Sequence, residues 1–134
     1  MNDGRIIPVP DGPNVEFYRH AVSGTLHLQR CPSCGRFQHP PRYRCPACGD
    51  ALEWVPLPGA GRIHSWTVTH RPVDPGWADR IPYATVVVEL DEGPRLVGGW
   101  ENAEPTDLGL DLPVTLRIEP AGDEFAFLWF SPRH

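Results

Sequence analysis

The chain has 134 residues, of which 12 are basic and 17 acidic, and its formal net charge at pH 7 is -5. Every basic residue is an arginine, because the sequence contains no lysine, and this excludes Schiff-base aldolases, pyridoxal phosphate enzymes and P-loop nucleotidases. The length suits one domain, or a small module joined to one compact barrel.

The first twelve residues, MNDGRIIPVPDG, predict an irregular arm. They contain no apolar run of the kind found in export signals, and no window of the chain reaches the ~18 apolar residues that cross a bilayer. We therefore expect a cytoplasmic protein without a membrane anchor. In that compartment thiols stay reduced, and paired cysteines bind metal more often than they form disulfides.

The segment PNVEFYRHAVSG, residues 13–24, predicts one short helix. Asn14 is expected to cap its N-terminus, and Gly24 lies just past its end. One side of this helix is apolar, and it covers either the core of the chain itself or a partner. The apolar stripe consists of two i,i+4 pairs, Phe17 with Ala21 and Tyr18 with Val22.

All four cysteines lie in the stretch CPSCGRFQHPPRYRCPACG, residues 31–49. Each CPxCG is a knuckle that brings two thiolates to one side, and four thiolates in a tetrahedron suit zinc or iron. Four filled positions leave no place for a reactive water, so we predict a structural metal site. Zinc is preferred to the iron of a rubredoxin-like electron carrier, since the connection between the knuckles is shorter than in rubredoxin. The predicted metal ligands are Cys31, Cys34, Cys45 and Cys48.

Beyond residue 59 the pattern changes to short strands separated by turns. The first is expected to contain a bulge, since Trp66 and Val68 face one way and Ile63 the other. Five strands without a long helix favour a small closed barrel of the OB type. The predicted strand segments are 61–72, 83–93, 94–102, 112–120 and 123–132.

The fold class is therefore predicted as mainly β. We expect an arm with a short helix at 1–24, a zinc ribbon at 25–58 and a five-stranded OB-fold barrel at 59–134. In the fourth strand Val114, Leu116 and Ile118 are expected to face inward.

The last strand segment is apolar on both faces, whereas a small barrel buries only one. The other face must be covered by the N-terminal helix, by the ribbon or by another chain, because an open face would mark an interface. The two sets are Phe125, Phe127 and Trp129 on one face, and Ala126, Leu128 and Phe130 on the other.

No catalytic residue is predicted. The metal site uses every cysteine, and the serines lack a nucleophile-elbow motif. His64 and His70 share a strand face but lie about 20 Å apart at ~3.3 Å per residue, too far to hold one ion. A weaker alternative is a hydratase or hydrolase site hidden in the barrel.

The ribbon is a basic island on an acidic chain. From residue 30 to residue 48 there are four arginines and no acidic residue, so a zinc tetrathiolate of charge -2 leaves this span at about +2. Such an island attracts phosphate-bearing ligands, including coenzyme A and nucleic acid. The alternative is that these arginines only keep the small module solvated. A ribbon beside an OB barrel keeps single-stranded nucleic acid as the alternative ligand, although the acidity of the whole chain opposes it.

The order of these motifs resembles the family known as domain of unknown function thirty-five, from about residue 13 to residue 132. The matching stretches are LHLQRCPSCGRFQHPPRYRCPACG, GAGRIHSWTVTHRP, IPYATVVVELDEG, RLVGGW, DLGLDLPVTLRIEP and FLWFSP. This family joins a rubredoxin-like zinc ribbon to an acyl-CoA-associated OB fold.

The resemblance implies a non-catalytic accessory subunit. Its partner would be a thiolase, a lipid-transfer-type aldolase or an enoyl-CoA hydratase that processes acyl-CoA thioesters, including those of steroid side-chain degradation. By the same resemblance the four cysteines are the zinc ligands. Arg36, Arg42 and Arg44 are the expected contacts to CoA phosphates or to an acidic partner.

Overall fold

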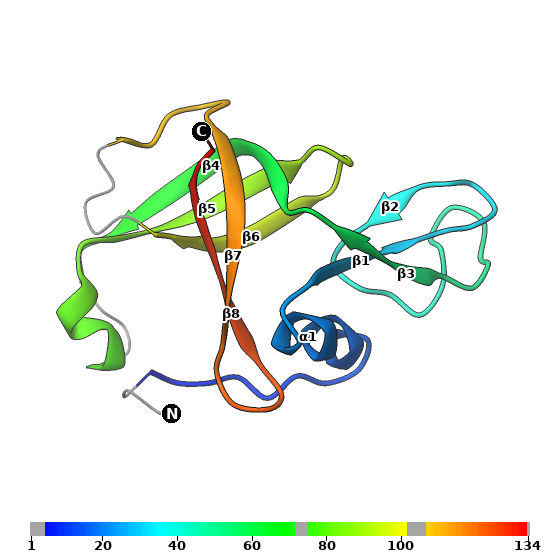
Figure 1. The fold of residues 1–134 in the computed structure, drawn as a ribbon, viewed down its shortest axis with the longest axis horizontal. Coiled ribbons are helices and arrows are strands. Elements are labelled where there is room, and N and C mark those ends of the chain that lie inside the picture. The colour runs from blue at the N-terminus through cyan, green and yellow to red at the C-terminus, as the bar shows by residue number, and fades with distance from the viewer. Residues whose placement is uncertain (1–4, 72–74, 102–106, 134) are drawn as a thin grey trace.

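The computed structural model describes residues 5–71, 75–101 and 107–133 of the chain (Figure 1). In these residues the regular elements are one α-helix, one 3-10 helix and eight strands, so the predicted mainly β fold is confirmed. Within the described residues, no helix combines the length and apolar character that crossing a membrane requires. In chain order the elements are α1 (Asn14–Val22), β1 (Leu26–Arg30), β2 (Phe37–Gln38), β3 (Glu53–Leu57), β4 (Ala60–Thr69), the 3-10 helix η1 (Pro75–Arg80), β5 (Tyr83–Leu90), β6 (Arg95–Trp100), β7 (Pro113–Pro120) and β8 (Ala126–Pro132).

Five strands close into a barrel in the order β4-β5-β6-β8-β7. Neighbouring strands are antiparallel except β6 and β8, which run parallel and close the barrel through two residue pairs. This arrangement is the predicted OB-type barrel. The register of β4 against β5 shifts between Ile63 and Ser65, which confirms the predicted bulge. Val114 is fully buried, and Leu116 and Ile118 pack against the same core, as expected for β7.

The cysteine region forms a second, smaller sheet in the order β2-β1-β3. Strand β1 lies in the middle and pairs along its whole length with β3, from Leu26 opposite Leu57 to Arg30 opposite Glu53. The sequence patterns at 25–30 and 51–59 did not predict these strands, because each is only five residues long and mixes polar with apolar residues.

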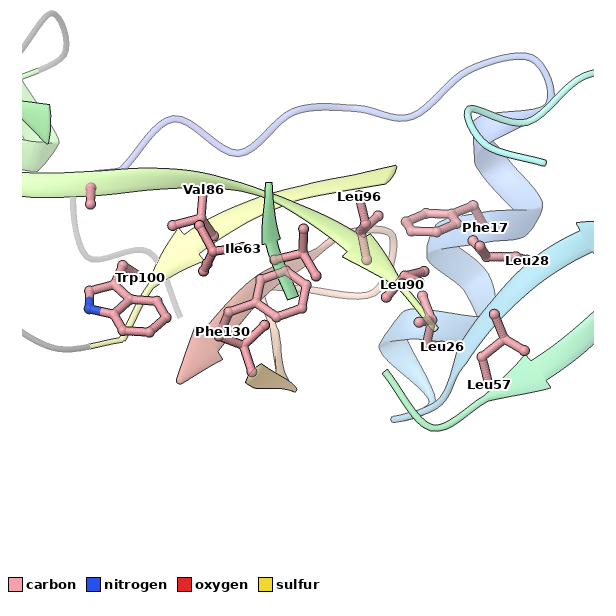
Figure 2. Close-up of a cluster of buried hydrophobic side chains, with 13 residues drawn as sticks. Phe17, Leu26, Leu28, Leu57, Ile63, Val86, Leu90, Leu96, Trp100 and Phe130 are labelled. Atoms are coloured by element: carbon pink, nitrogen blue, oxygen red, sulfur yellow. The ribbon is translucent and has the colours of Figure 1, made fainter. Parts of the chain in front are cut away.

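A single hydrophobic core runs through both sheets (Figure 2). At one end Leu26, Leu28 and Leu57 extend from the ribbon strands toward the barrel, and at the other end Trp100 fills the far side of the barrel. Phe17 of α1 lies against the junction and is 2% exposed. The ribbon and the barrel are therefore joined by buried apolar side chains. The buried members of this core are Phe17, Leu26, Leu28, Leu57, Ile63, Ala84, Val86, Val88, Leu90, Leu96, Trp100, Val114 and Phe130.

The helix α1 begins one residue earlier than expected. Pro13 occupies the capping position and no side chain caps the helix, so the prediction that Asn14 is the cap was wrong. Proline at this position is compatible with a helix start because its fixed φ matches the helical value. Phe17 and Ala21 are buried, so the apolar stripe covers the core of the chain itself.

The outward face of β8 is covered by the N-terminal part of the chain and by η1. The centre of the Tyr18 ring lies 4.6 Å from the centre of the Phe125 ring. The Arg5 guanidinium lies 4.1 Å from the centre of the Phe127 ring. Trp77 of η1 contacts Phe127 with an edge-on ring. Of the coverings that the sequence allowed, the structure uses the N-terminal helix, and it adds the arm and η1. This face therefore gives no argument of its own for a partner.

Candidate metal centre and the adjoining cleft

The four cysteine sulfurs meet at one point of the ribbon. Their Sγ atoms all lie within 4.8 Å of one another. The Cys31 and Cys48 sulfurs are 3.3 Å apart, and the Cys34 and Cys45 sulfurs are 3.8 Å apart. Cys31 and Cys45 are buried, whereas Cys34 and Cys48 lie at the surface.

The two knuckles have the same backbone geometry. The N–H of Gly35 donates to the carbonyl of Cys31 at 2.7 Å, and the N–H of Gly49 donates to the carbonyl of Cys45 at 2.8 Å. Both glycines have a left-handed backbone, with φ of 76° and 78°. A residue with a Cβ is strained in this conformation. Glycine after each CPxC is therefore required by the turn that aims two sulfurs at one centre.

Backbone N–H groups favour the thiolate form at all four sulfurs, and at two of them the pKa is lowered overall. The pKa of Cys45 is lowered to about 7, chiefly by a hydrogen bond from the backbone N–H of Cys48. The pKa of Cys31 is lowered by backbone hydrogen bonds within its own knuckle. The backbone N–H of Asp50 acts in the same direction on Cys48, but the hydrogen bonds of that thiol with the Cys31 and Cys45 sulfurs outweigh it and raise its pKa to about 12. A cation at the centre would relieve this competition, because it stabilises all four thiolates together.

The donor set fits a tetrahedral metal ion. Zn–S bonds of about 2.3 Å place the sulfurs of a tetrahedron about 3.8 Å apart, close to the observed spacing of the Cys34 and Cys45 sulfurs. Four thiolates would fill every position, so the ion would hold the two knuckles together and would not activate a water. Within the described part of the chain, no other cluster of three or more histidine, cysteine or acidic side chains has metal-binding geometry.

A buried glutamine fixes the loop between the knuckles. Gln29 is 5% exposed. Its Nε2 donates to the carbonyl of Arg42 at 2.7 Å, and its Oε1 accepts from the backbone N–H of Arg42 at 2.8 Å. The Nε2 of Gln38 donates to the same oxygen at 2.7 Å. Sequence reasoning missed Gln29, since a glutamine in a short polar strand gives no signal of its burial.

The three predicted contact arginines do not lie together. Arg36 and Arg42 line a cleft of about 490 Å³ between the ribbon and the turn that joins β5 to β6. Arg44 lies outside this cleft, and its guanidinium donates to the carbonyl of Gly49 at 3.3 Å. The cleft also contains buried side-chain atoms that have no hydrogen-bond partner: Gln38 Oε1, His39 Nδ1 and Glu92 Oε1.

His39 separates this polar cleft from an apolar pocket. The pocket, of about 320 Å³, is also lined by side chains of α1, β6 and β8. Burial lowers the pKa of His39 to about 4, so the ring is neutral near pH 7. Its centre lies 5.0 Å from that of the Phe17 ring.

The buried His39 predicts a loss of stability in mild acid. Because its folded pKa lies below the ordinary value of 6.5, protons bind the unfolded chain first, and stability falls as the pH drops from about 6.5 to about 4. Between pH 7 and pH 5 this amounts to about 1–2 kcal/mol. Urea unfolding of the wild type and of His39→Leu at both pH values measures it, and the variant should lose less stability on acidification. An equal loss in both proteins would contradict this assignment.

The remaining candidate side chains lie at the surface or make local contacts. His64 and His70 are both exposed, and neither belongs to a group of three or more potential metal ligands among the described residues. Ser23 donates to the carbonyl of His20, and Ser33 donates to Asp50, which links the two knuckles. The Trp129 and Phe127 rings contact each other and the Trp77 ring.

Two family descriptions match adjoining parts of the chain. Residues 20–53 match the rubredoxin-like zinc ribbon domain of ChsH2. Residues 54–119 match the C-terminal OB-fold domain of ChsH2.

Curated relatives are hydratase subunits and scaffold proteins. A probable enoyl-CoA hydratase alpha subunit of Thermomonospora curvata is 33% identical over 93% of this chain, which covers 39% of that protein. A 3-oxo-4,17-pregnadiene-20-carboxyl-CoA hydratase alpha subunit of Mycobacterium tuberculosis is 27% identical over 95% of this chain and 40% of its own length. A DUF35 domain-containing scaffold protein of Methanothermobacter thermautotrophicus is 36% identical over 82% of this chain and 84% of its own length. The chain thus spans about two fifths of each hydratase subunit and most of the scaffold protein.

A solved structure has the same fold. It is described as the Ltp2-ChsH2(DUF35) aldolase, and its matched chain superimposes with a TM-score of 0.82 at 33% identity. The match covers 93% of this chain and 98% of that chain.

Proposed function

Because the chain belongs to the ChsH2 (DUF35) family of zinc ribbon and OB-fold proteins, we propose that it is a non-catalytic accessory subunit of a CoA-thioester enzyme. In this role it docks to a thiolase-like aldolase or an enoyl-CoA hydratase and helps to bind the acyl-CoA thioester. The partner subunit carries the reacting groups.

One observation carries the proposal. The whole described fold, ribbon and barrel together, matches a chain of the Ltp2-ChsH2(DUF35) aldolase at 33% identity. The names of the hydratase alpha subunits and of the scaffold protein support the same kind of role. Since the chain spans only two fifths of the hydratase subunits, hydratase activity, acyl-CoA binding and the steroid substrate of one relative are proposals for this chain.

The proposed metal is zinc, held by Cys31, Cys34, Cys45 and Cys48. The tetrahedral set of thiolates supports a structural ion, which would fix the two knuckles and the loop between them. We also propose that the ribbon extends over residues 25–58 and the barrel over 59–134, with the arm and helix at 1–24.

The proposed contact to coenzyme A is the cleft lined by Arg36 and Arg42. Two guanidinium groups in one cleft suit a phosphate, because each forms charge-assisted hydrogen bonds with its oxygens. The apolar pocket beyond His39 would suit the uncharged part of such a ligand. Arg44 lies outside the cleft and is proposed to contact an acidic face of the partner instead.

Co-purification and kinetics test the proposal. The chain is expressed together with the thiolase-like or hydratase protein encoded beside it, and one complex should elute that turns over a CoA thioester. Separate elution, with activity unchanged when this chain is omitted, would disprove the accessory role.

The cleft is tested in the same complex with the double variant Arg36→Ala, Arg42→Ala. Loss of charge-assisted hydrogen bonds to phosphate should raise KM for the thioester at least about tenfold with little change in kcat. The matched control is Arg62→Ala, which removes an exposed arginine of β4. An equal KM for the double variant and the control would reject the cleft while leaving the accessory role standing.

A further inference from the structure

Strands β6 and β8 pair at only one end of the seam between them. Their parallel ladder consists of two residue pairs, Gly99 with Trp129 and Trp100 with Phe130. Next to this end the N–H of Glu101 donates to the carbonyl of Phe130 at 2.8 Å. Toward the beginning of both strands the pairing stops, so the barrel has an open stretch of seam there.

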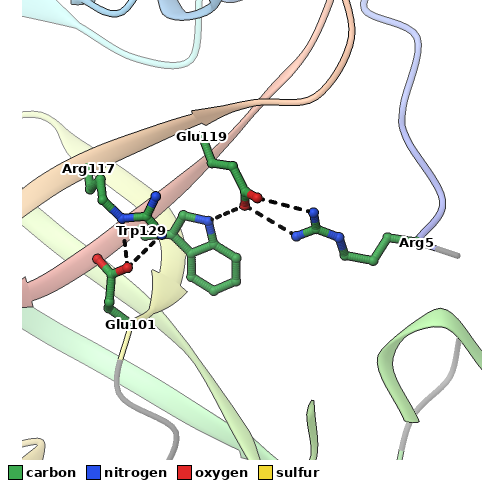
Figure 3. A network of polar contacts seen from close by, with 5 residues as sticks. All are labelled: Arg5, Glu101, Arg117, Glu119 and Trp129. Atoms are coloured by element: carbon green, nitrogen blue, oxygen red, sulfur yellow. Dashed lines mark hydrogen bonds and ion pairs between the residues drawn. The ribbon is translucent and has the colours of Figure 1, made fainter. Parts of the chain in front are cut away.

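Side chains brace the closed end of the seam (Figure 3). Arg117 of β7 reaches across β8, and its Nε donates to Glu101 Oε1 at 2.7 Å while its Nη2 lies 2.6 Å from the same oxygen. The Nε1 of Trp129 donates to Glu119 Oε1 at 2.8 Å, and Glu119 also accepts from Arg5. The closed end is therefore held by ion pairs and an indole as well as by the ladder.

At the open end, free backbone groups of β6 point toward β8. The N–H of Leu90 donates to the carbonyl of Pro94 at 2.9 Å in the turn before β6. Opposite residues of antiparallel strands alternate between bonded and non-bonded pairs, so the next residue of β6 bonded to β5 is Leu96. The N–H and C=O groups of Arg95 and Val97 therefore point away from β5. Among the described residues, neither has a strand partner on that side.

These free groups border the apolar pocket of about 320 Å³. Val97 and Leu128 line it from β6 and β8, and Phe17 and Tyr18 line it from α1. The Val97 side chain is 58% exposed, so this edge is open to a ligand from solvent. A ligand that covered the edge without bonding it would leave amide groups desolvated, at a cost of about 1–3 kcal/mol each. The pocket therefore favours a ligand with amide groups of its own.

The pocket adjoins the cleft that contains Arg36 and Arg42. His39 lines both cavities, and its Nδ1 is buried without a hydrogen-bond partner. A linear ligand that fills both has an anionic head followed by an amide chain. An added polypeptide strand fits less well, since strands usually have about five to six residues and only Arg95 and Val97 offer free groups here.

We propose that the free edge of β6 at Arg95 and Val97 binds the pantetheine arm of coenzyme A as a short extra strand, with the phosphates in the cleft of Arg36 and Arg42. The identity of this ligand rests on the proposed function. Pantetheine has two amides, each with one N–H and one C=O, joined by apolar spacers that suit the pocket lining. The hydroxyl between its phosphate and its first amide supplies a partner for His39 Nδ1.

Three probes titrated into the isolated chain test the site. Coenzyme A carries head and arm, 3′-phospho-ADP carries the head alone, and pantetheine carries the arm alone. Calorimetry should show coenzyme A binding at least about tenfold more tightly than 3′-phospho-ADP, because the tethered arm binds at a high effective concentration. The amide NMR signal of Val97 should move with coenzyme A and with pantetheine but not with 3′-phospho-ADP.

The variant Val97→Pro removes the N–H that points into the pocket. Because the N–H of Val97 does not bond β5, proline at this edge should leave the β5–β6 ladder intact. The affinity for coenzyme A should fall about three- to tenfold, as expected for one hydrogen bond, and the affinity for 3′-phospho-ADP should not change. Val97→Ala is the matched control, since it keeps the N–H and should bind coenzyme A like the wild type.

The outcomes separate this site from the proposed function. Equal affinity of the wild type for coenzyme A and 3′-phospho-ADP, or an unmoved Val97 signal, would overturn the edge site while the arginine cleft and the accessory role stand. A larger shift of this signal with the peptide acetyl-Val-Thr-Val-amide than with pantetheine would assign the edge to a polypeptide and also overturn the proposal. If the probe results hold but no partner co-purifies, the accessory role fails and the edge site stands.

Discussion

Replacing Cys48 by serine is expected to release the metal and unfold both knuckles. The four sulfurs converge on one centre, and apparent binding free energies of structural zinc are about 10–16 kcal/mol. One missing thiolate forfeits much of this stabilisation, and the loop between the knuckles has little buried apolar area to replace it. Elemental analysis should show metal falling from about one ion per chain to a small fraction. Amide NMR signals of residues 31–52 should collapse toward unfolded positions.

The unfolding caused by Cys48→Ser should be confined to the knuckles and the loop between them. Leu26, Leu28 and Leu57 belong to the common core, so the amides of β1, β3 and the barrel should stay protected in the variant. Ser33→Ala is the matched control, because Ser33 lies inside a knuckle and bonds Asp50 without contributing a sulfur. Full metal content in the serine variant would contradict the four-thiolate site. Partner binding should disappear with the metal if the ribbon contributes to docking.

Replacing Phe17 by alanine is expected to lower the free energy of unfolding by about 3–5 kcal/mol. The ring is 2% exposed and lies where α1, the ribbon strands and the barrel meet. Its removal leaves a cavity that three elements would have to collapse around, so little of the loss can be recovered. Chemical denaturation monitored by tryptophan fluorescence measures the change.

Val15→Ala is the control on the same helix. Val15 is 39% exposed, so its truncation should change stability by no more than about 0.5 kcal/mol. A comparable loss in both variants would contradict burial at the junction as the source of the loss, since alanine has a higher helix propensity than valine or phenylalanine. Separate unfolding transitions for ribbon and barrel in Phe17→Ala would show that this ring couples them.

The parts of the fold that the sequence predicted are those with local signals. The cysteine spacing and the glycine after each pair indicate the knuckles, because each turn is complete within five residues. The strands of the barrel show alternation or apolar runs, and the bulge follows from the reversed facing of Ile63 against Trp66. Five short strands without a long helix favour an OB-type barrel.

The parts that the sequence did not predict depend on contacts between distant residues. Arg5 and Glu119 are 114 positions apart, and nothing in either neighbourhood indicates that they meet. Gln29 binds the loop thirteen residues away. The helix η1 lies in a stretch rich in proline and glycine that reads as a turn. The cap of α1 was misplaced because Asn14 and Pro13 both suit a helix start.

The buried contact between ribbon and barrel limits how these proteins can be recombined. A cut after residue 58 would separate Leu26, Leu28 and Leu57 from the barrel residues that they pack against, and it would strand Phe17 with the ribbon. Both halves would then expose apolar side chains to water. A ribbon transferred from one relative to another must therefore carry side chains whose shapes match those of the new barrel. Ribbon and barrel would have to be exchanged together.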